Sequence, residues 1–203
     1  MIECIVRELS AVGLFVDNVH AECAPGQWEF VLPPADPVQA VDDLAKARHT
    51  ITCVAESFGL RATLSPRPHT GKSPTGSHVH MSLNPVTQAT QPLSDAFFAG
   101  AIAHLPSILV FCMPQVASYE RTGVANGMDP AKLSADERDA TGAHKVLPAS
   151  LEESLAALEC DQELIDLLGE QLVRVYLMIK RREADDFKAM DPSEQKRWLI
   201  SEF

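Results

Sequence analysis

The run from residue 74 to residue 83 places two imidazoles and a hydroxyl at alternate positions. In a β-strand successive side chains point to opposite faces, so His78, His80 and Ser82 would share one face. Histidine is a common metal ligand and titrates near neutral pH. The run therefore predicts a strand with one face suited to a metal ion or a phosphate, although two ordinary strand histidines would give the same pattern.

Two carboxylates, Glu22 and Glu29, form a second candidate group. Residues 27–32 alternate in the manner of a half-buried strand, which puts Glu29 on the polar face. Hard divalent cations such as Mg²⁺ take oxygen ligands. If this strand lies beside the histidine run, Glu22, Glu29 and His78 can converge on one metal ion. The alternative is that these glutamates are ordinary exposed acids.

Helical patterns surround both candidate groups. Asp36-Pro37 is typical of a helix start, and Gly59 of a helix end. Beyond residue 129 every element is predicted to be helical, with capping boxes that begin at Ser134 and Ser150. Elsewhere the apolar spacing predicts helices over 2–12, 37–58, 94–104 and 107–113 with a break at Pro106, a short strand over 61–65, an apolar helical stripe over 164–179, and a last helix from Pro192.

Composition excludes several classes of protein. The 203 residues are 46% hydrophobic and carry a formal charge of −11, which excludes a disordered chain and argues against a nucleic-acid partner. The five cysteines are widely spread, so neither a disulfide framework nor a structural zinc site is expected. The charged N-terminus does not match a signal peptide, and the apolar run 105–113 is too short for a bilayer. We therefore expect a cytoplasmic protein without a membrane partner.

Four segments, in this order, resemble the catalytic domain of glutamine synthetase. They are residues 20–29, 61–68, 76–83 and 118–121. The likeness extends to the branch that includes γ-glutamylpolyamine synthetases, and residues 129–200 are similar to its C-terminal helices. The resemblance implies an α+β fold. Residues 1–128 would form a partial catalytic domain with a curved antiparallel sheet and flanking helices, and residues 129–203 the helical C-terminal part of the same domain.

The resemblance also implies an activity, cofactors and partners. The reaction would be ATP-dependent amidation of the glutamate γ-carboxyl by ammonia or an amine, through γ-glutamyl phosphate, with Mg²⁺ or Mn²⁺ at the phosphates. A homo-oligomer is also implied. Strand edges and apolar helix faces that the missing segments would leave exposed predict association with full-length relatives. By position, the resemblance assigns the metal to Glu22, Glu29 and His78, the nucleotide and its phosphates to His80 and Ser82, and the glutamate substrate to Arg121 and Gly76.

The sequence departs from the family pattern in three places. The smaller N-terminal domain of the family is not in the sequence, and neither is the early part of the catalytic domain, whose paired glutamates complete the metal sites. Residues 122–128 join Arg121 directly to Asp129, where the family carries a long segment with arginines and a further metal glutamate. Pro74 stands where the family usually has glycine, so contact of that loop with substrate is in doubt.

These departures predict weak or no activity, because phosphoryl transfer needs cations around the developing negative charge. The alternative function is a non-catalytic fragment that acts as a binding or interaction protein. A third hypothesis, an unrelated metal-dependent hydrolase that uses His78, His80 and Glu29, does not explain the order of the motifs.

Overall fold

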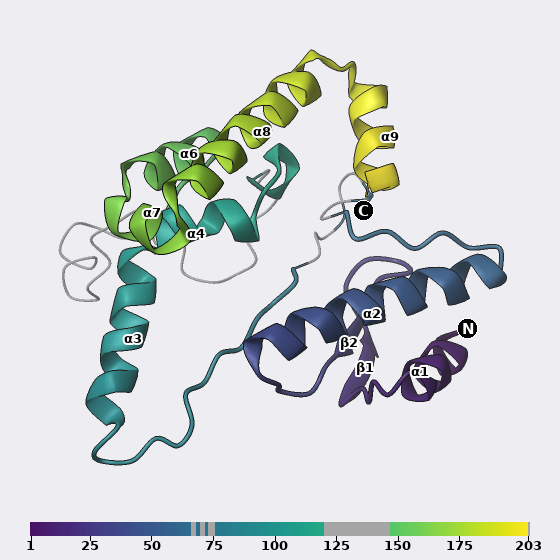
Figure 1. Cartoon of the computed structure of the whole chain (residues 1–203). Coiled ribbons are helices and arrows are strands. Elements are labelled where there is room, and N and C mark those ends of the chain that lie inside the picture. Colours follow the sequence, from purple (N-terminus) through teal and green to yellow (C-terminus); the bar gives the residue numbers. More distant parts are fainter. Residues whose placement is uncertain (66–67, 70–71, 73–75, 120–146, 203) are drawn as a thin grey trace. The chain divides into compact units, whose positions relative to one another are not determined.

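The computed structural model describes residues 1–65, 68–69, 72, 76–119 and 147–202 (Figure 1). It divides into two compact units, which we call unit 1 (residues 1–76 with 192–203) and unit 2 (residues 77–191). The described residues are mostly helical and include one two-stranded antiparallel sheet, which confirms the α+β prediction. The predicted boundary between residues 128 and 129 lies outside the described residues and stays a prediction.

Unit 1 is built around a contact between two helices and a β-hairpin. Its elements are α1 (Ile2–Ala11), β1 (Asn18–Ala21), β2 (Trp28–Val31), α2 (Pro37–Ser57) and α9 (Pro192–Glu202). Ile5 and Leu9 of α1 are buried against Ala47 and Val54 of α2, and Phe30 of β2 packs against the same cluster. The apolar face of the hairpin is thereby fixed, so the opposite face is the one that carries the polar side chains.

The ends of α2 agree with the sequence prediction, but its apolar stripe agrees only in part. Pro37 occupies the first turn, and the helix is followed by Gly59 with φ of +70°, a conformation that glycine adopts without steric cost. Asp36 is the residue before the helix, yet its side chain makes no capping hydrogen bond. Val54 is buried as predicted, whereas Val41 lies exposed. The helix therefore buries a narrower face than its sequence suggests.

Unit 2 is a helical assembly with one continuous core. Its elements are α3 (Gln91–Ala103), α4 (Leu105–Cys112), η1 (Val116–Tyr119), α6 (Leu151–Cys160), α7 (Gln162–Leu168) and α8 (Glu170–Ala189). The core residues share almost complete burial, and they are Val110, Leu151, Leu155, Leu158, Val173, Leu177 and Ala184. The Tyr176 hydroxyl donates to the carbonyl of Val110 at 2.9 Å. Burial raises the pKa of Tyr176 to about 12.

Two predicted strands are wrong. Residues 61–65 and 76–83, all of which the structure describes, belong to no strand. Alternation of side chains is a property of one segment, but a strand exists only where a neighbouring segment pairs with its N–H and C=O groups. Within the described residues β1 and β2 pair only with each other. The histidine run is therefore an exposed, unpaired segment rather than part of a sheet.

Three helix predictions need a finer description. The break near Pro106 falls at His104, and Pro106 lies in the first turn of α4, where proline is tolerated. The stripe 164–179 is interrupted by Gly169, whose φ of +93° separates α7 from α8. The capping box at Ser150 is confirmed, since its Oγ accepts from the N–H of Glu153 at 3.2 Å. The box at Ser134 lies outside the described residues.

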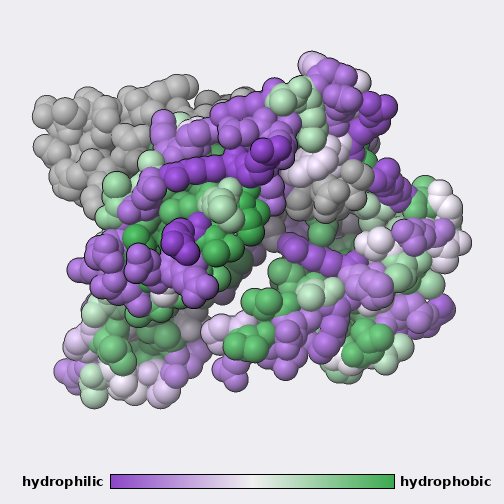
Figure 2. All heavy atoms as spheres, turned by 45° about the horizontal axis from the view of Figure 1, so that its top comes forward, coloured by the Kyte–Doolittle hydropathy of each residue, from purple (hydrophilic) through white to green (hydrophobic). Residues whose placement is uncertain are grey.

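Large apolar side chains are exposed in both units. In Figure 2 green hydrophobic residues gather in patches beside purple hydrophilic ones on the visible face. On α7 and α8 the exposed residues are Leu167, Leu168, Leu172, Val175, Met178 and Ile179, and on α2 they include Val38, Val41 and Leu44. Among the helices that the structure describes, no single one is long and apolar enough to cross a membrane. Only α3 and α4 together reach that length and composition, across a bend of 73°.

A partly buried ion pair joins α3 and α4 to α7, and it predicts a pH-dependent stability. The Nδ1 of His104 lies 2.8 Å from Oδ2 of Asp161. The hydrogen bond with Asp161 raises the pKa of His104. Burial raises the pKa of Asp161, but hydrogen bonds from His104, Ser107 and the Leu164 N–H outweigh it, so the pKa lies below its ordinary value.

The sign of the effect follows from these directions. A histidine whose pKa is raised on folding stabilises the fold fully below its unfolded value of about 6.5, and the contribution disappears as pH rises through the folded pKa. We therefore expect His104→Gln to lower the melting temperature more at about pH 5.5 than at about pH 8.5. Thermal denaturation at both pH values checks this, with His49→Gln on α2 as a control. An equal loss at the two pH values would contradict the prediction.

Candidate metal site

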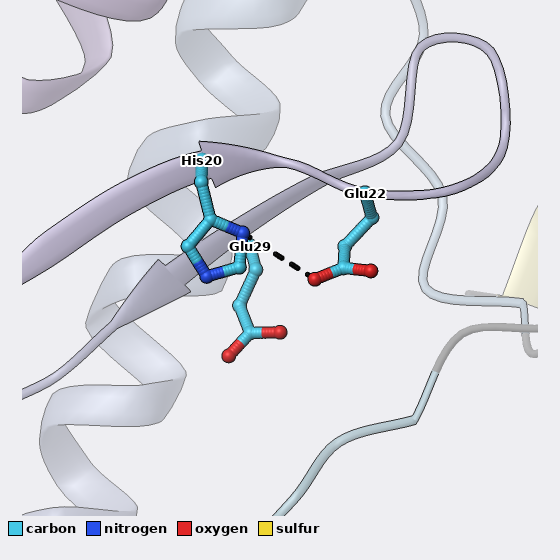
Figure 3. A group of neighbouring side chains, drawn as sticks. All are labelled: His20, Glu22 and Glu29. Atoms are coloured by element: carbon cyan, nitrogen blue, oxygen red, sulfur yellow. Dashed lines mark ion pairs between the residues drawn. The ribbon is translucent and has the colours of Figure 1, made fainter.

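The candidate site lies on the polar face of the hairpin in unit 1. β1 and β2 are antiparallel, and their register puts His20 directly opposite Glu29. Glu22 follows β1 by one residue, so it lies two residues after His20 and shares its face. Figure 3 shows the three side chains on one side of the ribbon, with His20 and Glu22 from the first arm of the hairpin and Glu29 from the second.

A short turn holds Glu22 in place. The N–H of Glu22 donates to the carbonyl of Gln27 at 2.9 Å, and the N–H of Gln27 donates to the carbonyl of Ala24 at 3.1 Å. The side-chain oxygen of Gln27 accepts from the N–H of Ala24 at 3.0 Å. Gly26 has φ of +74°, in the left-handed region that glycine adopts readily. Hydrogen bonds within the turn therefore fix the backbone between the two glutamates.

The three side chains can offer one ligand atom each to a single ion. One ligand atom from each of His20, Glu22 and Glu29 lies within 4.8 Å of the others. His20 Nδ1 lies 3.3 Å from Glu22 Oε1, and their side chains are 43% and 33% exposed. Two ligands bound at about 2.1 Å to one ion lie at most about 4.2 Å apart, so small side-chain rotations would close the site. Two carboxylates and an imidazole fit a divalent cation.

The other predicted site residues belong to other segments of the chain. His78, His80 and Ser82 are exposed on an unpaired segment of unit 2, where Ser82 Oγ accepts from Asn84 at 3.3 Å. Gly76 is exposed at the end of the first stretch of unit 1. Arg121 lies outside the described residues. The structure thus brings Glu22 and Glu29 together, and the convergence of His78 with them stays a prediction.

His20 is a site residue that the sequence prediction missed. The signal was present, because His-x-Glu spacing places both side chains on one face wherever the segment is extended. β1 is only four residues long and was not predicted as a strand. Without a strand before Glu22 there was no reason to place His20 on the same face as the glutamates.

The sequence matches the model of a known protein family. The family described as "Glutamine synthetase, catalytic domain" matches residues 1–139 and 122–198. The chain therefore belongs to the glutamine synthetase family, which confirms the resemblance on which the sequence analysis relied. This membership leaves the unrelated hydrolase without support.

Relatives of known name cover the chain almost completely. Protein fluG of Emericella nidulans is 34% identical over 266 aligned positions, which cover 100% of this chain and 30% of that protein. A glutamine synthetase of Methanocaldococcus jannaschii is 26% identical, covering 97% of this chain and 60% of that enzyme. The chain thus spans about a third to three fifths of these relatives. The alignment with fluG has more positions than this chain has residues, so fluG contains segments that this chain lacks.

Solved structures confirm the fold. A GmaS structure without ligand superposes with a TM-score of 0.73 at 21% identity, over 97% of this chain and 61% of that chain. A GmaS complex with ADP gives a TM-score of 0.72 at 19% identity, over 98% of this chain and 63% of that chain. At these identities the likeness establishes a glutamine synthetase fold for the chain.

Proposed function

We propose that the chain carries the metal-binding part of a glutamine synthetase active site. The observation that carries this proposal is the juxtaposition of Glu22 and Glu29 on one face of the hairpin, in a chain of this family. Carboxylate oxygens suit Mg²⁺ and Mn²⁺, and both glutamates keep part of their surface accessible to a ligand. His78 would complete this set.

The reaction proposed for a complete protein of this kind is the ATP-dependent amidation of the glutamate γ-carboxyl. The acceptor would be ammonia or an amine, and γ-glutamyl phosphate the intermediate. A divalent cation would neutralise charge on the transferring phosphoryl group. Glu22 and Glu29 would hold that cation in place. On the same proposal His80 and Ser82 contact the nucleotide phosphates, and Arg121 and Gly76 position the glutamate substrate.

For this chain alone we propose weak or no catalysis. Residues 122–128, which directly follow Arg121, contain no arginine or lysine. The two ranges that match the family overlap over residues 122–139, and the alignment with fluG contains more positions than this chain has residues. Both observations support the proposal that an internal segment of the family is missing from this chain. Without the arginines of that segment, the negative charge that develops in the transition state would be poorly compensated. We propose a cytoplasmic chain that forms homo-oligomers or associates with full-length relatives.

The second candidate is a non-catalytic binding or interaction protein of the same family. The observation that favours it is the number of large apolar side chains that lie exposed on α7 and α8. Surfaces of this kind commonly mark contacts with other chains. Such a protein would keep the family fold and part of its metal site without transferring phosphate.

The activity prediction is that the purified chain releases no phosphate above background. It would be given ATP, glutamate, Mg²⁺ and either ammonia or putrescine, and free phosphate would be measured against a reaction without protein. The physical reason is the shortage of cations around the transferring phosphoryl group. Robust turnover that disappears in Glu29→Ala would show that the chain is a complete catalyst.

The metal-binding prediction is that Mg²⁺ and Mn²⁺ bind weakly and that Glu29→Gln abolishes most of this binding. Removing one of two carboxylates halves the charge that attracts the cation. His78→Ala is expected to weaken binding further if His78 joins the site. Isothermal titration calorimetry checks both variants, with Glu56→Gln on α2 as the control. Identical titrations for wild type and His78→Ala would remove His78 from the proposed site.

A further inference from the structure

The hairpin cluster contains a nitrogen donor as well as two carboxylates, and the donor type decides which cations a site prefers. Mg²⁺ takes oxygen ligands and keeps several waters, whereas imidazole suits borderline cations such as Co²⁺ and Zn²⁺. A cluster of Glu22 and Glu29 alone would discriminate less between hard and borderline cations. The presence of His20 within 4.8 Å of both therefore changes the expected selectivity.

The placement of His20 is a consequence of the strand register. His20 is directly opposite Glu29 in the antiparallel pair, where Cβ atoms lie about 4.5–5.5 Å apart. It also shares its face with Glu22, whose position the 22–27 turn fixes. Two independent constraints, across the strands and along one strand, hold the imidazole beside the carboxylates.

The side chain of His20 is oriented toward the carboxylates. Its Nδ1 lies 3.3 Å from Glu22 Oε1, so the ring nitrogen faces the same space as the carboxylate oxygens (Figure 3). The side chain is 43% exposed, which leaves room for an ion to approach from solvent. His49, by contrast, lies on α2 with its Nε2 3.6 Å from Cys53 Sγ, and it is not part of the cluster.

We infer that His20 is a third ligand of the hairpin site and makes it bind a borderline divalent cation more tightly than Mg²⁺. The inference rests on the proposed function, since it assumes that Glu22 and Glu29 bind a cation. It adds the imidazole as the group that discriminates between cations. In the full protein this donor would let the site retain a transition metal where Mg²⁺ exchanges quickly.

The test compares Co²⁺ with Mg²⁺ on the full chain by calorimetry. Wild type should bind Co²⁺ more tightly than Mg²⁺, and His20→Gln should weaken Co²⁺ binding on the order of tenfold while changing Mg²⁺ binding far less. Glu29→Gln should weaken the binding of both cations. His49→Gln is the matched control. It removes an exposed histidine of the same unit that lies beside the thiol of Cys53 and is not part of the hairpin cluster.

A spectroscopic measurement tests the inference independently of the binding affinity. Bound Co²⁺ shifts the ring-proton NMR signals of a coordinating histidine. In His78→Gln a shifted imidazole signal should persist, and it should disappear when His20→Gln is added. No shifted imidazole signal in His78→Gln would overturn the inference, even if His20→Gln folds poorly.

The outcomes separate this inference from the proposed function. If Glu29→Gln abolishes binding of both cations but His20→Gln has no effect on Co²⁺, the metal site stands and His20 is not its ligand. If wild type binds neither cation, the proposed metal function and this inference both fail. If His20→Gln weakens the binding of Co²⁺ and of Mg²⁺ equally, His20 is a positioning residue, and its role in selectivity is overturned.

Discussion

Leu158→Ala is expected to destabilise unit 2 by about 3 kcal/mol, since replacing a fully buried leucine removes apolar contacts and leaves a cavity. Leu158 is 0% exposed and belongs to the core cluster that joins α4, α6 and α8. Small domains have total stabilities of only about 5–15 kcal/mol, so the loss is a large fraction of the whole. Urea denaturation followed by circular dichroism measures it.

The matched control for Leu158→Ala is Leu93→Ala. Both substitutions remove the same atoms from a helix of unit 2, but Leu93 on α3 is 70% exposed. Surface substitutions of this kind change the free energy of unfolding by within about 0.5 kcal/mol. Similar effects from the two variants would mean that α6 is not packed into a core in solution.

Local signals in the sequence predicted most of the helices. The start of α2 depends on Pro37, whose fixed φ suits a first turn, and the end depends on the glycine that follows. The start of α6 depends on the Ser150 hydroxyl and the N–H of Glu153, three residues apart. Such signals involve residues within one turn of each other, so the sequence alone contains all the information they need.

Strands depended on information that no single segment contains. The alternation in residues 76–83 is as regular as that in residues 27–32, yet only the second run contains a strand, β2. β2 has β1 as its partner, and β1 is a four-residue segment with no clear pattern of its own. Whether a segment forms a strand was decided by its pairing with another segment. The pattern of residues within the segment could not decide it.

The candidate site was predicted in part for the same reason. Glu22 and Glu29 were chosen by the resemblance and by the polar face of one strand, and the hairpin brings them together. His20 was missed because its position depends on the register between β1 and β2, which the sequence did not reveal. The nitrogen donor is therefore the part of the site that only the structure could supply.

The apolar surface of α8 leads to the second large effect, which is self-association. Leu172, Val175 and Ile179 are exposed and follow one another at spacings of three and four residues, so they form a stripe along one helix face. Leu167 and Leu168 of α7 add to the exposed apolar surface. Contiguous exposed apolar surface favours association because it removes that surface from water.

We therefore expect the purified chain at micromolar concentration to show a mass above that of the 22.1 kDa monomer in light scattering. Leu172→Lys combined with Ile179→Lys should shift it toward the monomer, because two charges on the stripe would have to be buried on association. Asp166→Asn combined with Glu170→Gln raises the net charge by the same amount without altering the stripe, and it should leave the assembly unchanged. A sharp monomer mass for the wild type, together with a cooperative thermal transition, would show that these apolar side chains do not drive association.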